Sequence, residues 1–248
     1  MDARKVAVVT GGMGGLGEAI CHKLNDSGYQ VVTTYSPNND HATSWLEEKR
    51  REGFRFSAYM IDVAEYGSCE AGVKKIVGDF GRVDVLVNNA GITRDASLRK
   101  MTLDDWQAVT HTNLDSVFNM TKQVLQSMFE SQWGRIINIS SVNGQKGAFG
   151  QANYAAAKAG VHGFTKALAL EVARKGITVN TVSPGYLRTK MVSSISKEIL
   201  ETKILPEIPL GRLGEPDEVA SLVAYLSSKD AAFVTGANIA INGGQHMF

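Results

Sequence analysis

The 248-residue sequence predicts an α/β fold in which helices cover both faces of one parallel sheet. Short apolar runs alternate with longer segments of helical periodicity along the whole chain, and the connections between them are short. The runs are apolar at successive positions, as in "KVAVVT" at 5–10, and parallel strands have this composition because both of their faces are buried. Since no internal repeat or linker interrupts the pattern, we expect a single, doubly wound domain over residues 1–248.

Hydrophobic period and glycine punctuation delimit the individual elements. The expected strands cover residues 5–10, 29–35, 54–63, 83–91, 134–141, 177–185 and 237–243, which makes a sheet of about seven strands. Helices are expected at 17–28, 40–53, 68–81 and 151–176, in pieces over 190–230, and at 104–132. The last of these segments is too long for one capped helix, and we expect it to form two.

The composition argues against several classes of function. The net charge of +1 gives no general attraction to nucleic acid or to an anionic membrane, and no apolar run reaches the length of a membrane span. The two cysteines and five histidines lack the spacing of metal ligands, so we expect no metal. We expect a cytoplasmic protein with free thiols. The charged run at 47–52 is expected to be a solvated helix face.

A glycine-rich turn follows the first expected strand. "TGGMGGLG" at 10–17 places Gly11, Gly15 and Gly17 between that strand and the next helix. Glycines there allow a tight turn and let backbone N–H groups approach a diphosphate at the helix N-terminus. Because strand, turn and helix come in the required order, the pattern predicts dinucleotide binding in a Rossmann-type fold. No Gly-Lys-Ser/Thr follows the turn, which argues against phosphoryl transfer.

The residues after the second expected strand leave the choice of cofactor open. An acid at this point binds the adenosine ribose of NADH, whereas a nearby arginine favours the 2′-phosphate of NADPH. The chain has Tyr35 here, with Asp40 slightly further on and no arginine beside them. The missing acid at Tyr35 favours NADPH, while Asp40 and the missing arginine favour NADH or dual use.

The stretch "NYAAAKAG" at 153–160 places Tyr154 and Lys158 one helical turn apart among small residues. One interpretation is a solvated pair on a helix surface. The other is a phenol whose pKa, ordinarily about 10, is lowered by the neighbouring ammonium. General acid catalysis is most effective when the pKa of the acid lies near the working pH. The second interpretation therefore predicts an enzyme, and the motifs elsewhere in the chain decide between the two.

Several motifs together resemble the short-chain dehydrogenase/reductase family. They are the glycine turn at 10–17, "NNAG" at 88–91, Asn113, "ISS" at 139–141, "YAAAK" at 154–158 and "SPG" at 183–185. The resemblance covers essentially the whole chain, in the order of the family. The segments that begin at Asn88 and Ile139 are most similar to acetoacetyl-CoA reductases of polyhydroxybutyrate synthesis, followed by 3-oxoacyl-carrier-protein reductases.

The resemblance implies a division of catalytic roles. Tyr154 is the proton donor to the substrate carbonyl, and Ser141 hydrogen-bonds the carbonyl oxygen as charge develops on it. Lys158 holds the nicotinamide ribose and lowers the pKa of Tyr154, and Asn113 holds a water that links Lys158 to solvent. Ser140 is the weaker candidate because it faces the other way in an extended strand.

The resemblance also implies the contacts to the cofactor. The expected residues are Gly11, Gly15, Leu16, Gly17, Tyr35, Asp62, Val63, Asn89, Ala90, Gly91, Tyr154, Lys158, Pro184, Gly185 and Thr189. Among them, Asp62 is expected at the adenine amino group and Thr189 near the diphosphate. Asn180, by contrast, is expected to be a buried structural amide.

A short 3-oxoacyl-CoA is the expected substrate, bound beside the segment 186–212. The candidate contacts are Arg94, Ser141, Phe149, Gln151, Tyr154 and Tyr186. An aromatic wall among them would limit the length of the acyl chain. Six cations near the cleft are either ligands of the CoA phosphates or solvated charges, namely Arg94, Arg99, Lys100, Arg188, Lys190 and Lys197.

Two further readings of the chain stay open. One is a dehydrogenase of a small polyol, steroid or sugar on the same scaffold, because fold alone specifies no substrate. The other is a catalytically silent, nucleotide-binding scaffold, against which the intact set of catalytic side chains argues. The family resemblance also implies a homotetramer in which long helices pair between subunits.

Overall fold

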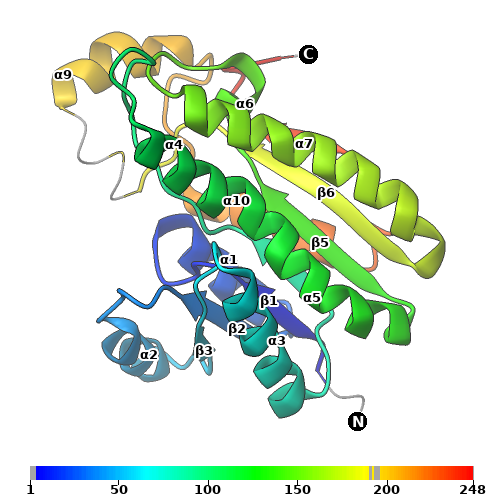
Figure 1. Cartoon of the computed structure of the whole chain (residues 1–248). Helices are drawn as coiled ribbons and strands as arrows, with labels where there is room; N and C mark the ends of the chain where they lie inside the picture. Colours follow the sequence, from blue (N-terminus) through cyan, green and yellow to red (C-terminus); the bar gives the residue numbers. More distant parts are fainter. Residues whose placement is uncertain (1–3, 190–191, 193–195, 248) are drawn as a thin grey trace.

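The computed structural model describes residues 4–189, 192 and 196–247, and it confirms the predicted fold. All its strands are parallel and form one sheet in the order β3-β2-β1-β4-β5-β6-β7 (Figure 1). The strands are β1 (Val6–Val9), β2 (Gln30–Tyr35), β3 (Ser57–Met60), β4 (Val85–Asn88), β5 (Gly134–Ile139), β6 (Ile177–Pro184) and β7 (Asn238–Ile241). The order reverses between β1 and β4, and in sheets of this kind ligands bind in the crevice at the carboxyl ends of the strands at that point.

Helices cover both faces of the sheet. They are α1 (Gly15–Asp26), α2 (Ala42–Arg51), α3 (Tyr66–Phe80), α4 (Leu103–Thr110), α5 (Ser116–Ser131), α6 (Val142–Lys146), α7 (Ala152–Val172), α9 (Lys197–Ile199) and α10 (Pro216–Ser227). Successive residues of β1 serve opposite faces. Ala7 and Val9 join the apolar cluster under α1 and α10, whereas Val6 and Val8 join the cluster under α3, α5 and α7. Figure 1 shows α3, α5 and α7 on the near face.

The long segment 104–132 forms two helices, as predicted, and the junction between them bears on the site. A π-helical turn at His111–Asp115 joins α4 to α5. A turn of this kind inserts extra backbone and changes the direction of its side chains, and such turns concentrate at functional sites. Asn113 lies within it and is buried.

The charged run at 47–52 is not wholly solvated, so that expectation was wrong at Lys49. This side chain is buried because α2 packs against α1, and its Nζ donates to Glu18 Oε1 at 2.9 Å and to Glu52 Oε2 at 2.9 Å. Trp45 Nε1 donates to the second oxygen of Glu18 at 2.8 Å. Burial alone lowers the pKa of Lys49, but the two carboxylates raise it above its ordinary value. The run therefore ties α2 to α1 beside the glycine turn.

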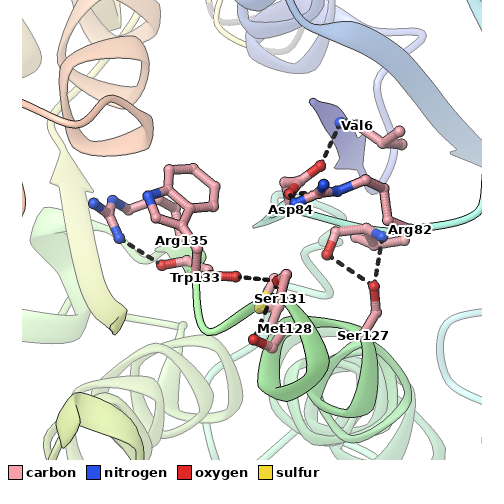
Figure 2. Close-up of polar contacts among 10 residues, drawn as sticks. Val6, Arg82, Asp84, Ser127, Met128, Ser131, Trp133 and Arg135 are labelled. Carbon is pink, nitrogen blue, oxygen red and sulfur yellow. Dashed lines mark hydrogen bonds and ion pairs between the residues drawn. The ribbon is translucent and has the colours of Figure 1, made fainter. Parts of the chain in front are cut away.

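The amino-terminal edge of the sheet buries an arginine whose partners are neutral. Arg135, only 2% exposed, donates from Nε to Ser228 O at 3.0 Å and from Nη1 to Gly134 O at 2.8 Å and Gly176 O at 3.2 Å. Its guanidinium carbon lies 4.5 Å from the centre of the Trp133 ring, the neighbour labelled with it in Figure 2. Because Ser228 follows the end of α10 and Gly176 follows a 3-10 turn, the cation stabilises carbonyls at the negative ends of helices.

A buried carboxylate completes the same edge. Asp84 accepts from Val6 N at 2.8 Å and from the Arg82 guanidinium, and next to it Val83 N donates to Ser127 Oγ at 2.8 Å (Figure 2). These contacts fix where β1 and β4 begin, at the edge of the sheet far from the glycine turn.

The described residues hold no helix with the length and apolar content that a membrane crossing requires. Within the same ranges, histidine, cysteine and acidic side chains form no group of three or more that could hold a metal. Cys21 and Cys69 are buried and unpaired, and burial raises the pKa of both thiols, that of Cys69 to about 12. Both thiols are therefore protonated and unreactive at neutral pH.

Candidate active site

The glycine turn after β1 is shaped for a group that approaches its backbone. Gly11 and Gly15 have φ angles of 63° and 44°, which side chains disfavour. A Cβ atom at Gly17 would lie 2.4 Å from Gly11 O, whereas one at Gly14 would meet nothing within 4 Å. Gly14 precedes α1 and gives it no side-chain cap, so the helix N-terminus stays suited to an anion. These features fit the diphosphate of a dinucleotide.

The segment 89–91 connects this turn to the catalytic candidates. Asn89 Nδ2 donates to Thr10 O at 2.9 Å and to Gly11 O at 3.2 Å, which holds the turn from behind. Ala90 packs against Gly11. A Cβ atom at Gly91 would lie 3.1 Å from Asn113 Oδ1 and 3.5 Å from Lys158 Nζ. A side chain at this position would press on the Asn113 amide, so the glycine helps to keep these groups close together.

The carboxyl end of β6 runs from the sheet to the start of α1. Pro184 ends β6, and Gly185 N donates to Ile241 O at 3.0 Å. Thr189 then reaches the glycine turn, where its methyl group would lie 3.4 Å from a Cβ atom on Gly15. Leu16 packs into the apolar cluster under α1. The structure thus brings together residues 184–189 and 11–17, as the proposed cofactor contacts require.

The far end of the crevice lies beyond β2 and β3. Tyr35 ends β2, and a surface hollow next to α2 is lined by Met13, Asn39, His41, Ser44, Trp45 and Glu48. Asp62 Oδ1 accepts from Ala64 N at 3.1 Å, and Val63 O accepts from Asn119 Nδ2 at 3.0 Å. The hollow was not singled out from the sequence, because its residues come together only when α2 packs on α1.

The catalytic candidates Ser141, Tyr154 and Lys158 come from two helices, α6 and α7. Ser141 caps α6 by accepting from Asn143 N at 3.1 Å, Tyr154 lies in the first turn of α7, and Lys158 follows one turn later. Lys158 is 4% exposed, and its Nζ donates to Ile139 O at 2.8 Å and lies 5.8 Å from the centre of the Tyr154 ring. The pair is therefore not a solvated ornament of a helix surface.

The pKa of Tyr154 shifts in the direction opposite to the one expected. Burial raises the pKa of Tyr154, a hydrogen bond with Ser141 lowers it, and the Asp95 carboxylate adds to the rise, so the net pKa lies above its ordinary value. Burial also lowers the pKa of Lys158 to about 8. The Nζ of Lys158 donates to Ile139 O and lies 5.8 Å from the centre of the phenol ring, and burial of the phenol outweighs the effect that lowers its pKa. The protein alone thus keeps the phenol protonated, as a proton donor must be.

The side-chain amide of Asn113 forms hydrogen bonds to the backbone. Its Oδ1 accepts from Ile92 N at 2.8 Å, and its Nδ2 donates to Ile92 O at 2.9 Å. These two bonds fix the turn that follows Gly91 and keep it against Lys158. The expected water on Asn113 stays a prediction.

A chain of hydrogen-bonded side chains beside Ser141 was not predicted from the sequence. Asn143 Nδ2 donates to Gln151 Oε1 at 2.9 Å, and Gln151 Nε2 donates to Asp95 Oδ2 at 2.9 Å. Gln151 was expected near the substrate, but its partners were not. The only signal in the sequence was that all three polar residues lie close to the expected catalytic motifs.

The remaining substrate candidates lie around this chain with different degrees of burial. Phe149 is 97% exposed, so its ring does not pack against other residues that the structure describes to form an aromatic wall. Tyr186 is half-buried and packs on the apolar cluster of Ile204, Ile208 and Leu213, and Arg94 is exposed.

The cations proposed for the CoA phosphates are not equivalent. Arg188 Nε lies 2.8 Å from Glu215 Oε1, and Lys197 Nζ lies 3.7 Å from Glu201 Oε1. Arg99 and Lys100 are exposed, as Arg94 is. Lys190 lies outside the described residues, as do parts of the expected substrate segment 186–212.

Comparison with known proteins agrees with this geometry. The family model described as short chain dehydrogenase matches residues 5–200. The chain belongs to the short-chain dehydrogenase family. It is 55% identical to the acetoacetyl-CoA reductase of Cupriavidus necator over 98% of this chain and 99% of that protein. It is 52% identical to the acetoacetyl-CoA reductase of Shinella zoogloeoides over 97% and 98%, and 46% identical to the 3-oxoacyl-[acyl-carrier-protein] reductase of Vibrio cholerae over 98% of both chains.

Membership in the short-chain dehydrogenase family agrees with the resemblance read from the motifs, and it favours an enzyme over a silent scaffold. The roles of the individual site residues stay predictions, because they rest on the placement of side chains around a cofactor site. That placement brings the glycine turn, Gly91, Asn113, Lys158 and the Ser141–Tyr154 pair together at the carboxyl ends of the strands.

Proposed function

We propose that this protein reduces acetoacetyl-CoA to (3R)-3-hydroxybutyryl-CoA with a nicotinamide cofactor, in polyhydroxyalkanoate biosynthesis. The observation that carries the proposal is the 55% identity over nearly the full length to an acetoacetyl-CoA reductase, in a chain that keeps Ser141, Tyr154 and Lys158 together. The lower identity of 46% to a 3-oxoacyl-[acyl-carrier-protein] reductase makes that activity the second candidate. The 3R configuration is carried over from the resemblance.

The side chains of the crevice divide the work of the reduction. The bound cofactor supplies the hydride that is transferred to C3 of the substrate. Tyr154 donates the proton that the carbonyl oxygen takes up, and the Ser141 hydroxyl stabilises the charge on that oxygen. Lys158 lies one helical turn from Tyr154, and its ammonium binds the nicotinamide ribose. Asn113 keeps the turn after Gly91 against Lys158.

The proposed contacts to the acyl-CoA lie near the hydrogen-bonded side chains of Asn143, Gln151 and Asp95. Gln151 and Tyr186 lie beside the acyl end, Phe149 closes over a short chain when the substrate binds, and Arg94 meets the pantetheine side. The exposed cations Arg94, Arg99 and Lys100 are the better candidates for the CoA phosphates, because Arg188 is already paired with Glu215. We also propose that residues 1–248 form one domain with the substrate segment at 186–212.

For the cofactor we propose a preference for NADPH over NADH. Tyr35 stands where an acid would repel a 2′-phosphate, and the hollow next to α2 is lined by Asn39, His41 and Ser44, whose side chains can form hydrogen bonds. A carboxylate oxygen of Asp40 lies 3.1 Å from His41 Nε2. Because an acid in this region favours NADH, the expected preference for NADPH is modest. Titration of purified protein with NADPH and NADH, followed by cofactor fluorescence, measures both dissociation constants. A lower value for NADH would overturn this preference.

The decisive experiment is a matrix of absorbance assays. Each cofactor is tested against acetoacetyl-CoA, longer 3-oxoacyl-CoA thioesters and a 3-oxoacyl carrier protein at equal concentration. The proposal expects kcat/KM to be highest for acetoacetyl-CoA. If kcat/KM rises steadily with chain length, or if the carrier-bound substrate wins by about tenfold, a difference of about 1.4 kcal/mol in transition-state binding, the carrier-protein reductase replaces it. No turnover with any of them would overturn the proposal.

A cytoplasmic homotetramer is the proposed form of the enzyme. Buried, unpaired cysteines suit a reducing compartment. Large apolar side chains stay exposed on the monomer, among them Leu103 and Phe118 near α4 and α5, and Leu170 on α7, as expected where helices pair between subunits. Light scattering coupled to size exclusion measures the mass, and a monomer would refute the assembly.

A further inference from the structure

Helix α7 is docked on the sheet by two rows of buried hydrogen bonds, and only one of them reaches the catalytic residues. The first row joins Asn138 Nδ2 to Thr165 Oγ1 at 2.9 Å and Thr165 Oγ1 to Thr181 Oγ1 at 2.8 Å. It crosses from β5 through α7 to β6, eleven residues beyond Tyr154 in the sequence. Figure 1 shows α7 lying along β5 and β6 over this distance.

The second row lies one helical turn nearer to the site and centres on His162. Its Nε2 lies 2.8 Å from Ser140 Oγ and 3.4 Å from Ser183 Oγ. Ser140 Oγ donates to the backbone carbonyl of Lys158 at 2.9 Å, and Ser183 Oγ donates to Asn238 Oδ1 at 2.7 Å. Ser140 directly precedes Ser141 and bonds the backbone of Lys158. This row therefore reaches the chain next to two of the catalytic candidates.

The proton positions in the second row follow from its acceptors. A backbone carbonyl can only accept, so the single hydroxyl proton of Ser140 is committed to Lys158 O. The oxygen of Ser140 must then accept from His162, which places a proton on Nε2. Burial, followed by the Lys166 and Lys158 ammonium groups, lowers the pKa of His162, so the ring is neutral and Nε2 carries its only proton.

We propose that His162 is a positioning residue of the reduction and acts through Ser140. By donating to Ser140, the imidazole directs the Ser140 hydroxyl onto the Lys158 carbonyl. Ser140 then ties the backbone of Lys158 to the end of β5, while Ile139 O holds the ammonium of the same residue at 2.8 Å. The last residue of β5, Ile139, and the residue after it, Ser140, thus hold Lys158 at its ammonium and at its backbone, and the next residue is Ser141. This proposal rests on the proposed reductase function.

The chain offers a matched pair of variants for the test. His162→Leu removes the donor of the second row, and Thr165→Val removes the equivalent bonds of the first row on the same face of α7. Both changes remove hydrogen bonds from buried polar groups, so both reduce stability. Only His162→Leu is expected to lower kcat for acetoacetyl-CoA, by at least about tenfold, which corresponds to about 1.4 kcal/mol, with the dissociation constant of the cofactor changed less than about threefold. His162→Gln, whose terminal N–H₂ can replace Nε2–H, is expected to recover most of this loss.

Hydrogen exchange provides a readout that needs no substrate. In His162→Leu, peptides from residues 152–162 should exchange faster than in the parent, whereas in Thr165→Val the acceleration should be confined to residues 163–172. The positioning role is overturned if the two variants lower kcat equally, if His162→Leu keeps more than about half of kcat, a loss below about 0.4 kcal/mol, or if glutamine gives no recovery. A parent protein that fails to reduce acetoacetyl-CoA would refute the proposed function, while the exchange patterns would still test the grip on Lys158.

Discussion

Lys158→Met measures how much stability this fold gives up for the lysine proposed to act in catalysis. The side chain is 4% exposed, and burial lowers its pKa from 10.5 to about 8. Between these two values the folded protein binds fewer protons than the unfolded chain. The stability of the parent protein therefore rises with pH across this window, and the charged ammonium is a cost below about pH 8. The difference between the two pKa values corresponds to about 3 kcal/mol at neutral pH.

Methionine is uncharged and does not titrate, so the variant escapes this cost. It also leaves Ile139 O without its donor, which costs about 1–3 kcal/mol at any pH. The two effects together predict that Lys158→Met is as stable as the parent near pH 7, or more stable by up to about 2 kcal/mol. Its advantage should then fall by about 2 kcal/mol between about pH 7 and about pH 9.5, because the parent loses its penalty over that range.

Urea unfolding followed by tryptophan fluorescence measures the free energy of unfolding of both proteins at a fixed protein concentration. Lys166→Met is the matched control, because Lys166 lies on the same helix but is exposed. The control should show no dependence of the difference on pH. If the difference between Lys158→Met and the parent were equally independent of pH, Lys158 would not be a buried cation with a depressed pKa, and the electrostatic account of the site would be wrong.

Three more predictions follow from the same geometry. Tyr154→Phe removes the proton donor but keeps the ring, so kcat should fall more than about tenfold, or about 1.4 kcal/mol, with little change in the cofactor dissociation constant; a smaller loss would exclude Tyr154 as the acid. Gly17→Ala brings a Cβ atom to 2.4 Å from Gly11 O and should cost about 1–3 kcal/mol in urea unfolding, whereas Gly14→Ala, with open space around its Cβ, should cost less than about 1 kcal/mol; equal costs would refute the packing argument. Arg135→Met removes the hydrogen bonds that the buried guanidinium donates to Ser228 O, Gly134 O and Gly176 O and should lower the free energy of unfolding by about 2–4 kcal/mol, a result that a loss below about 1 kcal/mol would contradict.

Features encoded over short sequence distances could be predicted well. The alternation of β-type and helical periods predicted a parallel, doubly wound sheet, and the glycines after the first strand predicted the turn that now has φ angles of 63° at Gly11 and 44° at Gly15. The four-residue spacing of Tyr154 and Lys158 placed them on one helix face, which α7 confirms. Each of these inferences depends on backbone geometry within one element or one turn.

Features that depend on how elements pack could not be predicted. Lys49 looked solvated because its neighbours are charged, and only the rotation of α2 against α1 buries it. The chain from Asn143 through Gln151 to Asp95 joins residues up to 56 positions apart. The pKa shift of Tyr154 had the wrong expected sign, because the spacing identifies the cation next to the phenol but not how deeply the phenol is buried.

The two edges of the sheet treat buried charge in opposite ways, and this contrast argues for the location of the site. At the amino-terminal edge, Asp84 is matched by Arg82 and a backbone N–H, and Arg135 by three carbonyls that include helix ends. At the carboxyl edge, within the described residues, the hydrogen bond recorded for the Lys158 ammonium goes to a single carbonyl. A chain selected for stability alone would give that cation an acidic partner or replace it by an apolar side chain. Its depressed pKa is instead the kind of local cost that accompanies a functional site, because a cation that is left underpaired by the protein can interact strongly with a ligand.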